Sequence, residues 1–166
     1  MLTEAQFEER HDKLNMFIIA MEDAHDEFLE AAAAKGYHVD YSLDNLPELE
    51  RYMLEQDVKF EHETDEEMIH FAHCWYHLGE VVRENFGGRW GVSNSEENSA
   101  NEGEWVIMEY KAIQEGIEFE PEGIARRFIR SQKPNALRTA IEADTNPQFF
   151  AASHAHLDSL PLEDEE

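Results

Sequence analysis

One predicted helix, over residues 65–86, constrains the fold more than any other feature of the sequence. Thr64 and Glu67 have the spacing of a capping box, which satisfies free backbone N–H groups at a helix start. Apolar side chains then recur every three or four residues, on one face of a helix, until Gly87-Gly88 ends the pattern. We therefore expect this helix to lie at the centre of the molecule. Its apolar positions are Met68, Phe71, Ala72, Trp75, Leu78 and Val82, with Phe86 at the end.

The rest of the chain predicts further helices and a small sheet. Thr3 and Gln6 have the spacing of a second capping box. Pro47 and Pro121 stand where proline is favoured, in the first turn of a helix. Residues 104–110 alternate between two sides, with the period of a strand. The predicted helices are 4–34, 46–56 and 121–131, with short helices after Pro134 and Pro147; the predicted strands are 89–92, 104–110 and 117–120, and the polar segment 93–103 is a loop.

These elements predict an α+β domain that is mainly helical, with a small antiparallel hairpin packed on the central helix. The chain has 166 residues, which suits one domain, and we assign it to residues 1–157. The acidic segment 158–166 is expected to be a disordered tail. No apolar run approaches the ~20 residues that span a bilayer, and the polar N-terminus does not resemble a secretory signal. A single cysteine fits a reducing compartment, so we expect a cytoplasmic protein without membrane contact.

The charge of the chain is strongly negative and unevenly distributed. There are 38 acidic and 13 basic side chains, a formal net charge of −25. Residues 1–67 hold 20 acids and 5 bases, whereas residues 68–90 hold two of each. A surface of this sign repels nucleic acid and anionic membranes and attracts cationic partners. The composition therefore argues against direct nucleic-acid binding and favours a basic protein partner.

A short motif begins in the second half of the central helix and continues into the next predicted strand. It has the order Tyr-x-x-Gly-Glu-x-x-Arg, then a Gly-Gly stop and a tryptophan on the next strand. This order resembles a group of small bacterial domains of largely uncharacterised function, some of which are similar to immunity proteins of toxin systems. The resemblance covers residues 40–130, and the long 93–103 segment departs from it. The motif residues are Tyr76, Gly79, Glu80, Arg83, Gly87, Gly88 and Trp90.

Two interpretations of this motif remain open from the sequence. Tyr76, Glu80 and Arg83 share one helix face, where Glu80 and Arg83 can pair at i, i+3. Gly79 lacks a side chain, so another backbone can approach the helix closely. The motif then either lines a binding cleft or forms a buried polar brace between the helix and the Trp90 strand. A brace needs no substrate, because buried charges are normally paired.

Histidines on the central helix raise the alternative of a helical metal site. His70, Cys74 and His77, or His73, His77 and Glu80, offer three ligands at i, i+4 and i+7. Three Glu-x-x-His pairs also occur, although an abundance of glutamate produces such pairs by chance. We expect these histidines to flank the core on exposed helix surface, and we assign no metal or other cofactor. The pairs are Glu8/His11, Glu22/His25 and Glu67/His70.

The sequence gives little support for catalysis. Cys74 lies in the middle of a helix, whereas reactive cysteines favour helix N-termini or cationic surroundings, so we expect a buried, inert thiol. No Gly-x-Ser-x-Gly elbow, phosphate-binding loop or dinucleotide motif is present. We therefore predict a protein that is not an enzyme.

The leading hypothesis is an immunity-type protein whose acidic helices occlude a cationic partner such as a toxin. One alternative is a mimic of DNA that occupies the groove of a DNA-binding protein. Another is adaptation to high salt, in which the charge is environmental. A basic patch around Arg126, Arg127, Arg130, Lys133 and Arg138 is either a solvated face or a dock for acidic groups. The predicted partner-binding residues are Glu22, Asp23, Asp26, Glu27, Glu30, Glu96, Glu97, Glu102 and Glu104.

Overall fold

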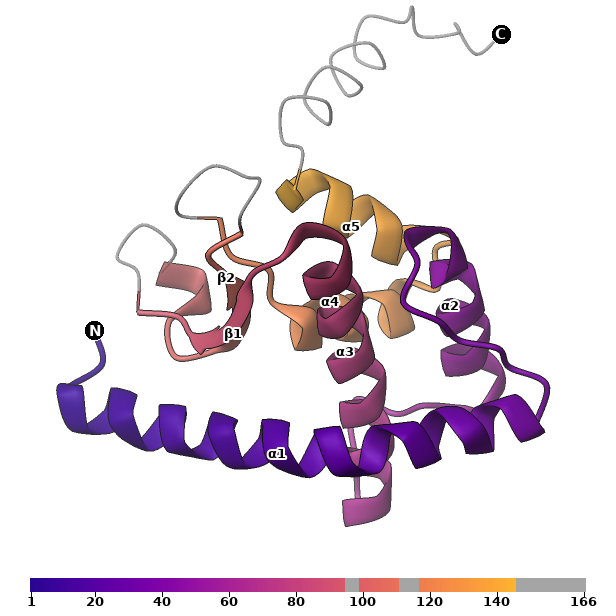
Figure 1. Ribbon diagram of the computed structural model, residues 1–166, viewed down its shortest axis with the longest axis horizontal. Coiled ribbons are helices and arrows are strands. Elements are labelled where there is room, and N and C mark those ends of the chain that lie inside the picture. Colours follow the sequence, from indigo (N-terminus) through magenta and orange to yellow (C-terminus); the bar gives the residue numbers. More distant parts are fainter. Residues whose placement is uncertain (95–98, 111–116, 146–166) are drawn as a thin grey trace, which may run out of the picture.

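The computed structural model describes residues 1–94, 99–110 and 117–145 (Figure 1). These residues form five α-helices and one two-stranded antiparallel sheet, which confirms the mainly helical α+β class. The predicted tail 158–166 and the helix predicted after Pro147 lie outside the described residues. The helices are α1 (Glu4–Ala34), α2 (Leu46–Glu55), α3 (Asp65–Phe86), α4 (Pro121–Ser131) and α5 (Ala136–Thr145); the strands are β1 (Arg89–Val92) and β2 (Trp105–Met108).

Helix α1 lies along one side of the molecule and crosses α3 (Figure 1). It has 31 residues, which corresponds to a length of about 46 Å. The predicted capping box is present: the Gln6 backbone N–H donates to Thr3 Oγ1 at 3.2 Å, and the Thr3 N–H donates to Gln6 Oε1 at 3.0 Å. Its buried positions recur on one face and are Leu14, Met21, His25 and Ala32.

Helix α3 is the centre of the fold, as the sequence predicts. Thr64 Oγ1 accepts from the Glu67 N–H at 3.2 Å. The Glu67 carboxylate accepts from the Glu63 N–H at 2.9 Å instead, so only half of the predicted box forms. Every residue from Phe71 to Gly79 is buried. The helix ends at Gly87, which has a positive φ of 77° that suits glycine.

The hairpin of β1 and β2 packs against α3. Trp90 pairs with Ile107 and Val92 with Trp105 in antiparallel register. The strand predicted over residues 117–120 is reduced to one bridge, in which Ile107 and Phe119 exchange backbone hydrogen bonds of 2.8 and 3.0 Å. Pro121 has no N–H to donate and begins α4 directly after Glu120, so the ladder cannot extend past Phe119 on its C-terminal side.

One cluster of buried apolar side chains runs from Leu14 in α1 to Ile141 in α5. The buried carboxylate of Glu50 in α2 accepts from the Asn135 N–H at 2.8 Å and the Leu137 N–H at 3.2 Å. It thus satisfies free N–H groups at the start of α5. Among the described helices, none is long and apolar enough to cross a membrane.

Candidate functional site

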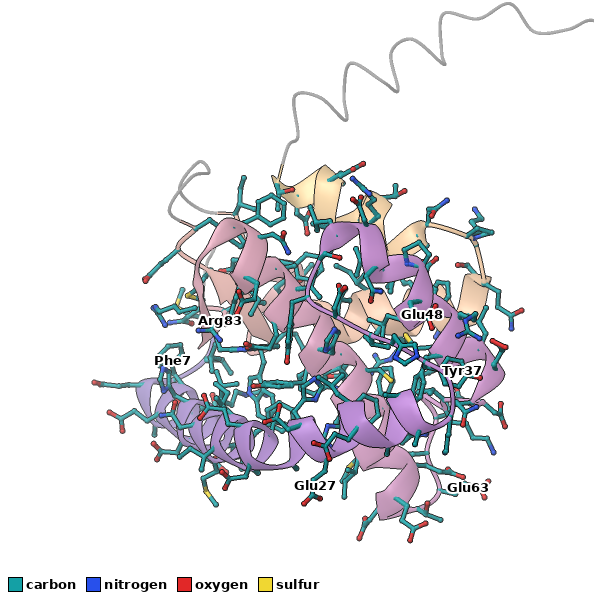
Figure 2. All side chains as sticks on the ribbon, turned by 45° about the vertical axis from the view of Figure 1, so that its right-hand side comes forward. Phe7, Glu27, Tyr37, Glu48, Glu63 and Arg83 are labelled. Atoms are coloured by element: carbon teal, nitrogen blue, oxygen red, sulfur yellow. The ribbon has the colours of Figure 1, made fainter. Side chains whose placement is uncertain are left out.

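Five predicted partner-binding residues form one exposed surface on the second half of α1, which we call the acidic surface. All five side chains are exposed. Within the described part of the chain, none of them forms an ion pair with a basic group. Figure 2 shows Glu27 pointing outward from α1. The acidic surface therefore presents unneutralised charge to solvent. Its residues are Glu22, Asp23, Asp26, Glu27 and Glu30.

The predicted acids beyond α1 do not join this surface. Glu102 faces the N-terminus, where its carboxylate lies 3.2 Å from the Met1 amine and accepts from the Leu2 N–H. Next to it, Arg10 donates to the Gly103 carbonyl at 2.8 Å. The acidic surface begins 12 residues after Arg10, which is about 18 Å further along the helix. Glu96 and Glu97 lie outside the described residues.

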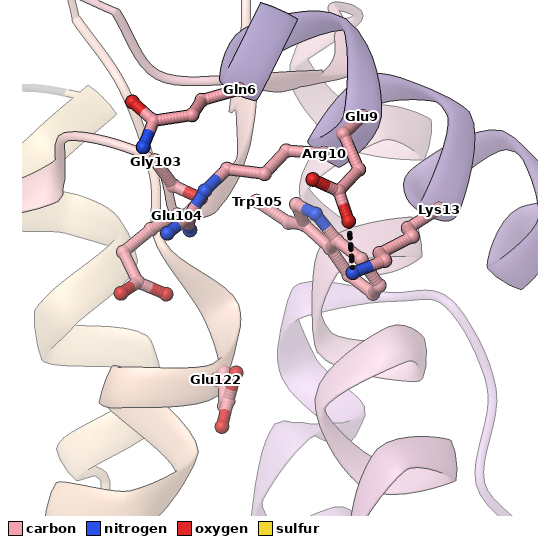
Figure 3. Close-up of a pocket in the computed structure, with 8 residues that line it drawn as sticks. All are labelled: Gln6, Glu9, Arg10, Lys13, Gly103, Glu104, Trp105 and Glu122. Carbon is pink, nitrogen blue, oxygen red and sulfur yellow. Dashed lines mark hydrogen bonds and ion pairs between the residues drawn. The ribbon is translucent and has the colours of Figure 1, made fainter. Parts of the chain in front are cut away.

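Glu104 lines a hollow of mixed charge between α1 and the start of β2 (Figure 3). The hollow has a volume of about 470 Å³. Arg10 and Lys13 line it together with Glu9, Glu104 and Glu122, and Glu9 pairs with Lys13 at 2.9 Å. Because cations and carboxylates alternate here, this region is not an extension of the acidic surface.

Three carboxylates of this region lie close together. One oxygen from each of Glu104, Glu120 and Glu122 lies within 4.8 Å of the other two. Glu120 caps α4, since both its oxygens accept from the Gly123 N–H at 2.8 and 2.9 Å, and Glu122 pairs with Arg126 at 2.7 Å. Burial raises the pKa of Glu120 and of Glu122, and the nearby charge of Glu104 adds to both shifts. Their contacts thus start and brace a helix.

An apolar groove lies beside the acidic surface, where α1 crosses α3. We call it the α1–α3 groove, and its volume is about 590 Å³. Phe60 and His62 line one part of it, and Glu122 and Arg126 of α4 line another. Trp105 and Glu122 also line the mixed-charge hollow, so the two cavities adjoin. Its small and aliphatic lining comes from Ala20, Met21 and Ala24 of α1 and Met68, Ile69 and Ala72 of α3.

The sequence pattern places Met68 in the core, and this is wrong. Met68 is 43% exposed and its neighbour Ile69 is 49% exposed. The N-terminal end of α3 projects past α1 (Figure 1), so the crossing helix does not cover these two side chains. An apolar stripe predicts which face is apolar, but not how far along the helix the packing partner reaches.

One wall of the α1–α3 groove is a cluster of aromatic rings. Phe17 stacks on Trp75, with ring centroids 4.7 Å apart and planes 15° from parallel. Trp105 lies 5.0 Å from Phe17 and 6.1 Å from Trp75. Three rings packed on one another hold a fixed shape, because each restricts the rotation of the others. The groove therefore has a rigid wall.

Three histidines form a hydrogen-bonded chain between α1 and α3, which we call the histidine chain. His25 Nδ1 lies 3.2 Å from His73 Nδ1, and His25 Nε2 lies 2.9 Å from His77 Nδ1. His77 Nε2 lies 2.8 Å from the Asp40 carbonyl oxygen. A carbonyl oxygen only accepts, so His77 carries its hydrogen on Nε2, and its Nδ1 accepts from His25 Nε2–H. His25 Nδ1 then accepts from His73 Nδ1–H, so each contact in the chain joins one donor to one acceptor while all three rings are neutral.

Burial keeps these rings neutral. His25, His73 and His77 are 3%, 8% and 0% exposed, respectively. Desolvation, followed by the effects of His77 and His73, lowers the pKa of His25 to about 3. Desolvation also lowers the pKa of His73 and of His77. The expectation that the histidines of the predicted metal sets lie on exposed helix surface is therefore wrong for this cluster.

The two predicted ligand sets do not converge. His70 hydrogen-bonds Tyr52 Oη at 2.8 Å, away from the histidine chain. Cys74 is 0% exposed, and burial raises the pKa of its thiol, as expected for an inert cysteine. Glu80 contacts Trp90 and Arg83. The sequence reasoning missed His25 as the partner of the pair His73 and His77. His25 lies four residues after Met21 and three before Phe28, and this apolar spacing is the signal that could have found it.

The motif residues make the contacts of a polar brace. Trp90 Nε1 donates to Glu80 Oε1 at 2.8 Å, and Arg83 Nη1 donates to the same oxygen at 2.7 Å. The Tyr76 ring stacks on Trp90, with centroids 5.9 Å apart and planes 7° from parallel. A Cβ on Gly79 would lie 2.3 Å from the Trp90 ring, so glycine allows this contact. Glu80 and Arg83 also line a small hollow of about 180 Å³.

The last two motif glycines connect α3 to β1. Gly87 and Gly88 both have positive φ, 77° and 94°, at this connection.

The basic patch contacts carboxylates of the protein itself. Arg126 pairs with Glu122, while Arg138 pairs with Asp44 at 2.8 Å and Glu142 at 3.0 Å. At least these two guanidinium groups engage the protein's own carboxylates.

No family model matches the chain, and comparisons with curated proteins and with solved structures return no match. The resemblance of the motif to small bacterial domains, some of them similar to immunity proteins, stays a prediction.

Proposed function

We propose that this protein is a non-enzymatic, immunity-type binding protein that occludes a cationic protein partner, such as a toxin. The observation that carries the proposal is the acidic surface: five exposed carboxylates within nine residues of α1, without an ion pair in the described part of the chain. Exposed carboxylates at this density produce a local field that attracts basic groups.

The position of these carboxylates in α1 supports a role other than helix stability. Negative charges stabilise the N-terminal end of a helix and destabilise the C-terminal end, because of the helix dipole. The acidic surface lies in the C-terminal half of α1, and the last turn holds no basic residue. Glu30, about one turn from the end of α1, thus works slightly against the helix that carries it, whereas a basic partner would neutralise its charge.

The expected mechanism is steering followed by occlusion. Opposite charges accelerate association, and salt weakens this attraction because it screens charges over about 10 Å at 0.1 M. The affinity for the partner should therefore fall steeply with added salt. Helix α1 already holds the backbone of the acidic surface in one arrangement, so binding has to order side chains but not backbone.

The test compares two variants that each lose five carboxylates. The surface variant carries Glu22→Gln, Asp23→Asn, Asp26→Asn, Glu27→Gln and Glu30→Gln. The control variant neutralises five exposed acids elsewhere and has the same net charge. Its changes are Glu8→Gln, Asp12→Asn, Glu61→Gln, Glu66→Gln and Glu84→Gln.

Each protein is used to capture partners from nuclease-treated extract of the native host at low salt. The affinity of the purified partner is then measured across a salt series. We expect a basic protein that the wild type and the control variant retain and the surface variant loses. Equal retention by both variants, or an affinity that does not depend on salt, would refute the proposal. Displacement of the captured protein by duplex DNA would identify it as a DNA-binding protein and favour the DNA-mimic alternative.

A further inference from the structure

We propose that the α1–α3 groove receives the apolar face of a cationic amphipathic helix that belongs to the partner. This inference rests on the proposed function and adds the site and the kind of segment that it binds. It starts from the apolar surface that the described residues leave uncovered. Met68 and Ile69 are 43% and 49% exposed in the groove, and Ala20 is exposed opposite them. Uncovered apolar side chains beside a cavity are typical of a protein-binding site.

The charges around the groove indicate a cationic occupant. On α1, Asp23 and Glu27 follow Ala20 by three and seven residues, the spacing of neighbours on one side of a helix. On α3, Asp65 precedes Ile69 by four residues and is exposed. Both helices thus place carboxylates next to apolar groove residues. The cation that α4 contributes to the lining, Arg126, is already paired with Glu122 at 2.7 Å.

Each of the two helices that line the groove contributes about two turns to it. Its lining runs from Phe17 to Ala24 in α1 and from Met68 to Trp75 in α3. Each stretch covers seven residue steps, which is about 10 Å of helix. Two turns of an amphipathic helix present apolar anchors at i, i+3 or i+4, and i+7 over that distance. The stacked wall of Phe17, Trp75 and Trp105 offers these anchors a preformed surface.

The net charge argues against a second copy of this chain as the occupant. Each copy carries a formal charge of −25, so two copies repel one another, and the repulsion is strongest between acidic surfaces brought together. A basic helix instead gains from the same field and covers the same apolar side chains. The groove and the acidic surface thus favour one kind of segment, apolar on one face and basic along its edges.

The test uses two synthetic peptides and two tryptophan substitutions. One peptide is an amphipathic helix of leucine and lysine, and the other replaces each leucine with serine and keeps every lysine. Ala20→Trp fills the groove without a change in charge. Ile19→Trp adds the same ring to α1 one residue earlier, where Ile19 is 62% exposed and lies outside the groove lining. Binding is measured by calorimetry, and thermal unfolding checks that each variant is folded.

We expect the leucine–lysine peptide to bind the wild type, and the serine–lysine peptide to bind at least about tenfold more weakly. Ala20→Trp should lower the affinity for the leucine–lysine peptide about tenfold, while the affinity of Ile19→Trp should stay within about twofold of the wild-type value. Equal affinity of the wild type and Ala20→Trp would overturn the groove proposal. So would a wild-type dimer, seen by sedimentation, that Ala20→Trp converts to a monomer, because the occupant would then be a second copy.

The failure of this inference can be separated from the failure of the proposed function. If the surface variant binds both peptides more weakly than the wild type and Ala20→Trp binds neither more weakly, the acidic surface binds cations and the groove takes no part. If Ala20→Trp lowers the affinity for the leucine–lysine peptide and the surface variant does not, the groove binds a helix by apolar contact alone. The cationic character of the occupant and the electrostatic function would then both be refuted.

Discussion

Two regions along α3 differ in how far the rest of the protein covers their side chains. In the N-terminal part, the α1–α3 groove leaves Met68 and Ile69 about half exposed. Further along is the closed region, the histidine chain and the Trp90 brace, whose side chains hydrogen-bond within the protein. His73 lies at the border of the two regions, because it also lines the groove. The same two helices, α1 and α3, build the groove and the histidine chain.

The difference separates structural residues from candidates for binding. Polar groups in the closed region are already satisfied, so a change there should mainly alter the free energy of unfolding. Apolar side chains in the open region stay about half exposed in the folded protein, so a change there should alter the free energy of unfolding less and binding to a partner more. The predictions below test this division, from the largest expected effect on stability to the smallest.

Gly79→Ala should damage the closed region most. The new Cβ would lie 2.3 and 2.4 Å from two atoms of the Trp90 ring, which stacks on Tyr76 and donates to Glu80. We expect a loss of at least about 3 kcal/mol in the free energy of unfolding, or failure to fold. Urea denaturation measures it, with Ala20→Gly as a helix control of about 1 kcal/mol. A loss of less than 1 kcal/mol would show that Trp90 moves freely and that the brace is not tight.

His25→Phe should destabilise the protein by about 2 kcal/mol at pH 7, because His73 and His77 each lose a buried hydrogen-bond partner. The effect should depend on pH. The pKa of His25 is about 3 in the folded protein and about 6.5 in an unfolded chain, so protons favour the unfolded state between these values. The contribution of this ring is complete above pH 6.5 and falls by about 2 kcal/mol at pH 5.

The destabilisation by His25→Phe should therefore nearly vanish at pH 5. Urea denaturation at both pH values checks it, with His38→Phe at an exposed position as the control. A difference between wild type and His25→Phe that is the same at pH 7 and pH 5 would contradict a neutral, buried His25.

Ile69→Gln should lower the free energy of unfolding by about 1 kcal/mol. Ile69 lies in the open region and is 49% exposed, so the substitution removes only about half of the apolar area that a fully buried isoleucine would lose. The matched change in the closed region is Val82→Gln, at a side chain with 0% exposure in the same helix. It should cost about 3 kcal/mol, because it buries an amide without a partner. Similar losses for both variants, measured by thermal unfolding, would abolish the distinction between the regions.

Glu30→Gln should raise the free energy of unfolding by about 0.3 kcal/mol, because it removes a negative charge near the C-terminal end of α1. Glu4→Gln makes the same change in the first turn of that helix and should lower the free energy by a similar amount. Denaturation at low salt compares the pair. Two changes of the same sign would show that general repulsion, rather than the helix dipole, governs these charges.

Local signals made much of the fold predictable. Thr3, Thr64 and Gly87 are caps that act within a few residues, so the bounds of α1 and α3 agree with the sequence analysis. The alternating segment around Ile107 likewise gave β2, although the observed strand is shorter. The third strand failed, since pairing beyond Phe119 is limited by the proline that begins α4.

The site was less predictable, because it depends on where α1 crosses α3. The crossing places His25 between His73 and His77 and leaves Met68 beyond the reach of α1. Residues 25 and 73 are 48 positions apart, and no local spacing relates them. The exposed acids of α1 were predictable, since charged side chains on a helix with one apolar face lie on the other faces.

The burial of Cys74 allows the rate at which α3 opens to be measured by thiol labelling. It is the single cysteine of the chain, it is fully buried, and burial raises the pKa of its thiol. A thiol reagent can modify it only after this part of the helix separates from its neighbours, so the labelling rate reports how often that happens. A partner that binds the folded protein should slow the labelling in proportion to its occupancy. One native side chain thus allows binding to be followed on unmodified protein.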